Sequence, residues 1–99
     1  MRLTREEKQQ VVDMYWDDFY CFNICEWFEY NHPRYAKRIL RRMLKSYGYT
    51  IKDWKKLQKD ADKFDCDASE EIESITLDSM NVMLDECHID TDKTYVESY

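Results

Sequence analysis

The clearest helical signal in this chain lies in residues 33–48, which read PRYAKRILRRMLKSYG. At about 100° per residue, the basic side chains fall within an arc of about 140°, and apolar side chains occupy the other side. Pro33 suits the first position of a helix, and Gly48 supplies a C-terminal stop. The pattern therefore predicts an amphipathic helix over 33–47 with one basic and one buried face.

A long helix is predicted before this segment. Thr4 followed by Glu7 is the pattern of a capping box, which would open a helix over 4–30. Its second half, residues 19–28, is apolar nearly all round, so we expect it at the centre of the core. A buried strand is the competing interpretation of this short apolar run, because periodicity alone does not separate the two.

Two more helices are predicted after the basic one. Thr50 followed by Asp53 is a second capping pattern and opens a helix over 51–64, which has an apolar stripe and an exposed lysine face. A helix over 70–87 follows a short polar loop. The polar tail, residues 89–99, carries no clear pattern, and its sequence fits either a frayed or a packed end.

These elements predict an all-α fold. The chain contains one glycine and one proline, which leaves little turn chemistry for a many-stranded β fold. Its 99 residues leave no room for a second independent core. We therefore expect one domain over 1–99, a small bundle of three to four helices. The expected core residues are Val12, Tyr15, Trp16, Phe19, Ile24, Ile39, Met43, Trp54, Leu57, Ile72, Met80 and Met83.

Charge is sorted along the chain. Residues 31–59 hold ten Lys/Arg against one Asp, a local balance of +9. Residues 60–99 hold thirteen Asp/Glu against two Lys, a balance of −11, and residues 1–30 add −4. Segregated charge of this size creates faces of opposite potential, which select partners and accelerate encounters more than they select a fold.

The basic segment supplies the first candidate binding residues. They are Arg34, Lys37, Arg38, Arg41, Arg42, Lys45, Lys52, Lys55, Lys56 and Lys59. Gly48 stands where a helix-turn-helix motif has its turn, so nucleic acid is one candidate partner. Two features weaken that interpretation. Leu44 occupies a position where the motif requires a small residue, and only Gln58 joins the lysines on the candidate reading face.

The acidic segment supplies a second candidate face. Its residues are Asp65, Asp67, Glu70, Glu71, Asp78 and Asp85. A series of carboxylates can imitate a phosphate backbone and occupy the nucleic-acid groove of another protein. The alternative interpretation is a solubilising surface that neutralises basic helices of the same or a neighbouring copy. Three aromatic residues border the basic face and are candidate contacts, namely Tyr35, Tyr47 and Tyr49.

No metal, cofactor or catalytic site is expected. A calcium loop starting at Asp65 fails at its sixth and twelfth positions, which hold Glu70 and Thr76 in place of Gly and Glu. The four cysteines contain no Cys-x-x-Cys pair of the kind that binds zinc. No Gly-rich phosphate loop or nucleophile–base order can be found, so we expect a protein that is not an enzyme.

The sequence therefore predicts a non-catalytic module that binds a macromolecule through charged faces. The absence of an apolar leader and of a long apolar run predicts a cytoplasmic protein without membrane contact. Small size and a composition poor in Gly, Ala and Pro favour a phage or mobile-element accessory or inhibitor protein that binds a host protein in the host cytoplasm. Such a protein would act by anti-defence or by nucleic-acid mimicry. The alternatives are a helix-turn-helix-like nucleic-acid binder that uses residues 34–59 and a self-associating structural or regulatory protein, a homo-oligomer.

Overall fold

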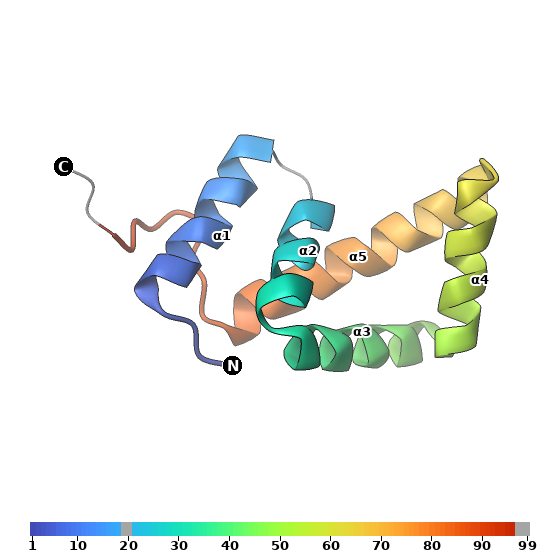
Figure 1. Cartoon of the computed structure of the whole chain (residues 1–99), viewed down its shortest axis with the longest axis horizontal. Helices are drawn as coiled ribbons and strands as arrows, with labels where there is room; N and C mark the ends of the chain where they lie inside the picture. The colour runs from blue at the N-terminus through green and yellow to red at the C-terminus, as the bar shows by residue number, and fades with distance from the viewer. Residues whose placement is uncertain (19–20, 97–99) are drawn as a thin grey trace.

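The computed structural model describes residues 1–18 and 21–96, and these form five α-helices without a strand (Figure 1). The helices are α1 (Arg5–Asp18), α2 (Cys21–Asn31), α3 (Pro33–Tyr47), α4 (Ile51–Asp62) and α5 (Cys66–Glu86). The predicted all-α class is confirmed. The number of helices is five rather than three to four.

The extra helix arises in the N-terminal third, where α1 and α2 replace the single helix expected over 4–30. The two helices pack against each other and bury Val11, Val12, Ile24 and Phe28 in one cluster. In one continuous helix the two halves would lie along a common axis, and neither could cover the apolar face of the other. Tertiary burial therefore outweighs local helix continuity here.

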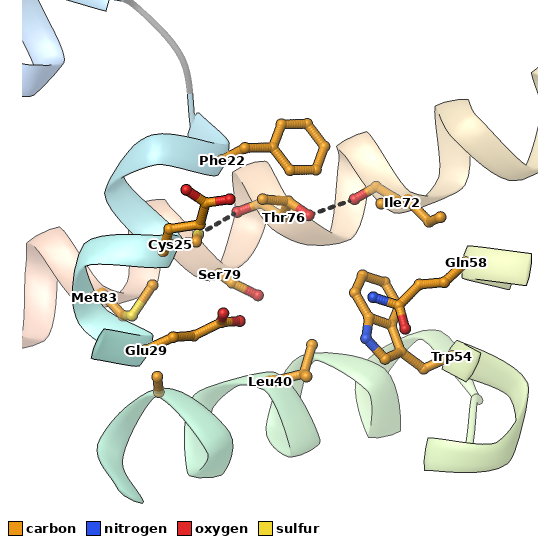
Figure 2. Close-up of a pocket in the computed structure, with 12 residues that line it drawn as sticks. Phe22, Cys25, Glu29, Leu40, Trp54, Gln58, Ile72, Thr76, Ser79 and Met83 are labelled. Carbon is orange, nitrogen blue, oxygen red and sulfur yellow. Dashed lines mark hydrogen bonds between the residues drawn. The ribbon is translucent and has the colours of Figure 1, made fainter. Parts of the chain in front are cut away.

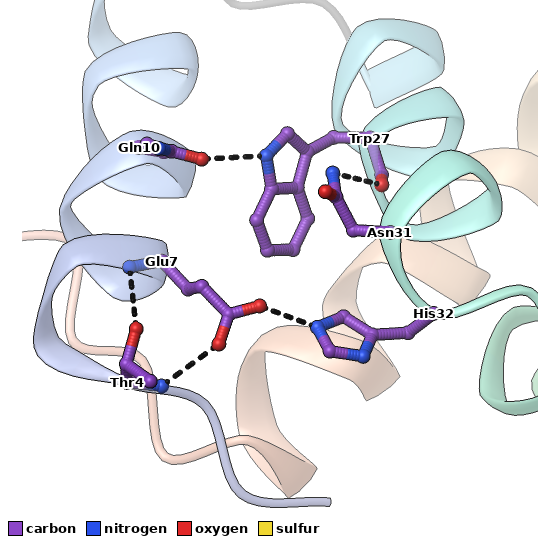
Figure 3. A network of polar contacts seen from close by, with 6 residues as sticks. All are labelled: Thr4, Glu7, Gln10, Trp27, Asn31 and His32. Carbon is purple, nitrogen blue, oxygen red and sulfur yellow. Dashed lines mark hydrogen bonds and ion pairs between the residues drawn. The ribbon is translucent and has the colours of Figure 1, made fainter.

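Polar contacts hold α1 against the start of α3 (Figure 3). The Thr4–Glu7 capping box is confirmed, with both reciprocal hydrogen bonds at 3.1 Å. The second carboxylate oxygen of Glu7 lies 2.5 Å from Nε2 of His32, and the Trp27 indole donates to Oε1 of Gln10 at 3.0 Å. The cap that begins α1 thus also fixes the position of α1 on its neighbours.

The predicted ends of α3 are confirmed. Pro33 occupies its first turn, and Gly48 follows its last residue in the left-handed conformation with φ of 79°. The predicted capping box of α4 is also present, because Thr50 accepts from the amide of Asp53 and the Asp53 carboxylate accepts from the amide of Thr50. Short-range capping chemistry is readable from sequence where the polar pair is three residues apart.

The boundary between α4 and α5 differs from the prediction. The α4 helix ends two residues earlier than expected, and Phe64 adopts a left-handed conformation with φ of 65°. The α5 helix begins at Cys66, four residues earlier than expected, because the Asp65 carboxylate accepts from the amides of Asp67 and Ala68 at 3.0 and 3.2 Å. The corner between these helices is therefore tighter than the loop predicted for it.

The helices α3, α4 and α5 form three sides of a triangle joined by short turns, and α2 packs against α3 and α5 at the end away from α4 (Figure 1). The main core lies among α1, α2, α3 and α5. The α4 helix has no buried residue, and its apolar stripe is only half-buried. Helices that meet at corners cannot pack face to face along their whole length, which leaves α4 at the edge of the core.

Five of the expected core residues are buried, and they are Val12, Ile24, Ile39, Met80 and Met83. Five more are half-buried, namely Tyr15, Met43, Trp54, Leu57 and Ile72. Trp16 is wrongly placed by the prediction, because it is 52% exposed and its indole donates to the carbonyl of Thr91. Phe19 lies outside the described residues. The list of expected core residues omitted Val11, Leu44 and Ile75, which are fully buried. Phe28 belongs to the apolar run 19–28 that was expected in the core, and it is fully buried too.

The segment that follows α5 returns to α1. Ile89 is buried, and Oε1 of Gln9 accepts from the amides of Tyr95 and Val96 at 2.8 and 3.3 Å. Residues 89–96 are thus packed on α1 rather than frayed. No helix within the described part of the chain combines the length and the apolar character needed to cross a membrane.

Candidate binding surface

The ten candidate basic residues all lie on α3 and α4, and all ten side chains are exposed. We call them the basic face. Among the residues that the structure describes, Arg42 is the only member in an ion pair, with Nη2 at 2.5 Å from Oε2 of Glu86. Arg38 lies over the ring of Tyr35 at 5.4 Å from its centroid. Most of the positive charge is therefore left without a carboxylate partner in the described chain.

Two other carboxylates of α5 accept hydrogen bonds from tyrosines at and just after the end of α3. The hydroxyl of Tyr47 donates to Asp78, and that of Tyr49 donates to Glu71 at 2.9 Å. The hydrogen bond to Asp78 raises the pKa of Tyr47 to about 12, and the bond to Glu71 raises that of Tyr49. The two predicted aromatic contacts thus tie the end of α3 to α5, while their rings stay half-buried.

Tyr35, the third predicted aromatic contact, is not at the surface, because it is only 5% exposed. Its hydroxyl donates to Oε1 of Glu86 at 3.0 Å and accepts from the thiol of Cys87 at 3.7 Å. Burial raises the pKa of Tyr35, so the phenol stays protonated. The periodicity placed it beside the basic face, and it does lie at that border, because Arg38 covers its ring and Arg42 donates to the same Glu86. Because it is buried, Tyr35 is nevertheless removed from the candidate surface.

The six candidate acidic residues are not brought together. Asp65, Asp67 and Glu70 are exposed where α4 meets α5, and with Asp62 they form what we call the acidic corner. Asp85 is exposed near the other end of α5. The remaining two, Glu71 and Asp78, accept hydrogen bonds from tyrosine hydroxyls, as described above. Three of the six candidates therefore belong to the acidic corner, and the other three do not.

Phe64 stands at the acidic corner, although the sequence pattern placed it on the apolar stripe of the helix expected over 51–64. Its side chain is 92% exposed, and its backbone has a positive φ that an L-residue adopts at a steric cost. The signal in the sequence is a single large apolar residue between Lys63 and Asp65. An aromatic side chain held outward in this way is available to a partner.

A cavity of about 200 Å³ lies between α2, α3, α4 and α5 (Figure 2). Its lining combines apolar side chains such as Leu40 and Trp54 with polar ones such as Glu29 and Ser79. Sequence reasoning did not find it, because its walls come from four helices whose relative placement no local pattern encodes.

The described residues contain no cluster of three or more His, Cys, Asp or Glu that could hold a metal ion. His32 is paired with Glu7, and the thiol of Cys87 is buried against Tyr35. Burial raises the pKa of Cys87, which disfavours the thiolate that a metal would require. Cys66 is exposed at the first residue of α5.

Comparison with protein-family models, with curated protein sequences and with solved structures finds no match for this chain.

Proposed function

We propose that this protein is a non-catalytic binding module whose basic face engages an acidic surface on a protein partner. The observation that carries the proposal is the state of that face. Ten exposed basic side chains lie on two adjoining helices, and nine of them form no ion pair with a described residue. Like charges clustered without an internal partner repel one another and lower the stability of the folded state, and an acidic partner would remove this repulsion.

A complementary partner surface would gain mainly in association rate and orientation. Exposed ion pairs are individually worth about 0–1 kcal/mol, so the face would act as a set rather than through one residue. The anchoring energy of such interfaces usually comes from a few buried aromatic or arginine side chains. Phe64 is the exposed aromatic residue nearest in sequence to the lysines of α4. An inhibitor or accessory protein works in this manner, by occupying a surface of its target.

The acidic corner favours protein over nucleic acid. It lies at the C-terminal end of α4, the helix whose lysines would have to enter a groove. A phosphate backbone that approached α4 would meet Asp62, Asp65 and Asp67 beside the lysines, and the repulsion would offset part of the attraction. A protein surface can carry both signs of charge and a pocket for Phe64.

Duplex nucleic acid is the second candidate partner, and one observation favours it. The α3 and α4 helices meet at the Gly48 turn and cross steeply, as the two helices of a helix-turn-helix do (Figure 1). Leu44 is larger than the residue that the motif requires at its position, but it is buried at 1% exposure, so the fold accommodates its side chain.

One titration separates the two candidates. A labelled poly-glutamate peptide and a labelled short DNA duplex are titrated by fluorescence anisotropy at about 50 and 200 mM salt. The face variant Lys37→Glu with Arg41→Glu is compared with the control Arg2→Glu with Arg5→Glu, which makes the same charge change outside the face. We expect the peptide to bind, the face variant to weaken binding at least tenfold, and the control to match the unmodified chain.

Other results of this titration would change or overturn the proposal. Tighter binding of the duplex than of the peptide, with a steep loss at higher salt, would transfer the proposal to nucleic acid. Absence of binding to both probes at the lower salt would overturn the role of the basic face. Sedimentation velocity in the same buffers tests the third interpretation, because pairing of basic and acidic faces between copies would give a dimer only at low salt.

A further inference from the structure

The cavity between α2, α3, α4 and α5 follows from the way the helices are joined. The α4 helix meets α3 at the Gly48 turn and α5 at the acidic corner, so it closes the triangle without filling it. Side chains from all four helices project into the space that remains, and its volume is about 200 Å³. An engineered apolar cavity of about 150 Å³ holds a benzene molecule, so this one has room for a ligand built on a single ring.

The polar part of the lining offers mainly hydrogen-bond acceptors. The Ser79 hydroxyl donates a hydrogen bond to the carbonyl of Ile75 at 2.8 Å, and the Thr76 hydroxyl donates one to the carbonyl of Ile72 at 2.7 Å. Each oxygen therefore retains lone pairs but no proton for a ligand. Glu29 and Glu26 add carboxylates from α2, both exposed to solvent, and neither forms a hydrogen bond or ion pair with another described residue. A hydrogen-bond donor with positive charge would suit all of these acceptors.

The opposite wall is aromatic. Figure 2 shows the Glu29 carboxylate on one side of the cavity and the Trp54 indole, with the Gln58 amide beside it, on the other. An indole face attracts a cation within about 6 Å of its centroid. Leu40 and Phe22 supply apolar surface at the edges of the same space. A carboxylate facing an indole across an apolar gap is an arrangement suited to an organic cation.

From this geometry we propose that the cavity binds a small organic ammonium ion that carries one aromatic ring or a short branched alkyl group. The ammonium hydrogens bond the Glu29 carboxylate and the oxygen of Ser79, and the apolar group packs against Trp54 and Leu40. An anion of the same size would be repelled by Glu29. A neutral analogue would lose the charge-assisted hydrogen bond to Glu29.

The test uses three probes of one shape, namely benzylammonium, benzyl alcohol and benzoate. Each is titrated into the full chain while the indole N–H signals of its three tryptophans are followed by NMR. The signal of Trp54 is identified by its loss in Trp54→Phe, and Trp16 and Trp27 serve as internal references because neither lines the cavity. We expect benzylammonium to shift the Trp54 signal in a saturable manner and the other two probes to leave it unchanged.

Variants of Glu29 then test the charge requirement. Glu29→Gln should weaken benzylammonium binding about tenfold or more, the size expected for a lost charge-assisted hydrogen bond. Glu73→Gln is the matched control, because Glu73 is an exposed glutamate of α5 outside the lining. Glu29→Asp keeps the charge on a shorter side chain and should give an intermediate affinity, with circular dichroism confirming the fold of each variant.

Three results would overturn the proposal. One is a Trp54 signal that no probe shifts at millimolar concentration. The second is equal binding of benzyl alcohol and benzylammonium, which would make the cavity merely apolar. The third is unchanged benzylammonium binding by a folded Glu29→Gln variant.

Discussion

The α3 and α4 helices carry the same kind of sequence and reach different depths of burial. Both have lysine or arginine on one side and apolar residues on the other. The α3 helix buries Tyr35, Ala36, Ile39 and Leu44, whereas α4 buries none of its residues. The difference lies in what faces them, because α3 packs on both α2 and α5, while α4 packs mainly on α5 with the cavity beside it. Amphipathic spacing sets which side turns inward, and the neighbouring helices set how far.

The largest expected effect contrasts one aliphatic residue from each helix. Ile39→Ala on α3 removes a side chain with 0% exposure and should cost about 2–5 kcal/mol of the free energy of unfolding. Leu57→Ala on α4 removes a half-buried side chain and should cost about 1 kcal/mol. Urea denaturation of both variants measures the difference. Equal losses would mean that α4 is packed as tightly as α3.

The ends of the two helices offer a second contrast, since both are followed by a residue in the left-handed conformation. After α3 that residue is Gly48, and a Cβ added there would meet no atom within 4 Å. Gly48→Ala should therefore cost only the backbone strain of an L-residue, about 1–2 kcal/mol. Thermal unfolding with matched Lys45→Ala as the control, an exposed α3 position, measures the loss. An unchanged midpoint would show that the turn relaxes without strain.

After α4 the left-handed residue is Phe64, so the opposite substitution should have the opposite sign. Phe64→Gly relieves the strained backbone and removes a side chain that is 92% exposed. The greater freedom of glycine in the unfolded chain reduces the gain, which leaves a stabilisation of up to about 1 kcal/mol. The measurement is the thermal midpoint. A lower midpoint would mean that the phenyl ring stabilises the corner through contacts of its own.

The smallest effect concerns pH. Hydrogen bonds from Arg42 and then Tyr35 lower the pKa of Glu86 below its ordinary value of 4.5. A carboxyl group with a lowered pKa in the folded state stabilises the fold above the unfolded value, and that contribution is lost as the pH falls through the folded value. The unmodified chain should thus lose more thermal stability below about pH 4.5 than Arg42→Gln does. Parallel pH profiles of the two proteins would contradict this link between α3 and α5.

Sequence reasoning succeeded where the determinant is local. The capping pairs at Thr4 and Thr50, and the glycine stop at Gly48, involve residues a few positions apart, and all three are present. The limits of α3 follow from such signals. The start of α5 was placed four residues too late, because the polar residues before 70 were assigned to a loop, whereas Asp65 caps a helix that begins at Cys66. The local sequence offers several possible first residues for this helix, and the packing of α5 on α4 decides which one is used.

The misplaced elements depend on contacts between distant segments. The division of the first predicted helix places Trp27 against Gln10, a contact that exists only once α2 has folded back. Tyr35 is buried at the border of the basic face, where its hydroxyl donates to Glu86, 51 residues away. The periodicity of α3 alone left Tyr35 next to the basic residues. The cavity also depends on contacts between distant segments. Its lining comes from four helices, so the sequence of any one helix does not reveal it.

The fold also separates the first residues and the segment after α5 from α4. Residues 1–4 lie near the end of α5 and lead into α1, residues 89–96 lie beside α1, and α4 stands at the opposite end of a molecule 47 Å long (Figure 1). A tag or fused protein attached before residue 1 would therefore leave α4 and the acidic corner unobstructed. A sensor chip that holds the protein by such a tag would present these surfaces to solution in a uniform orientation.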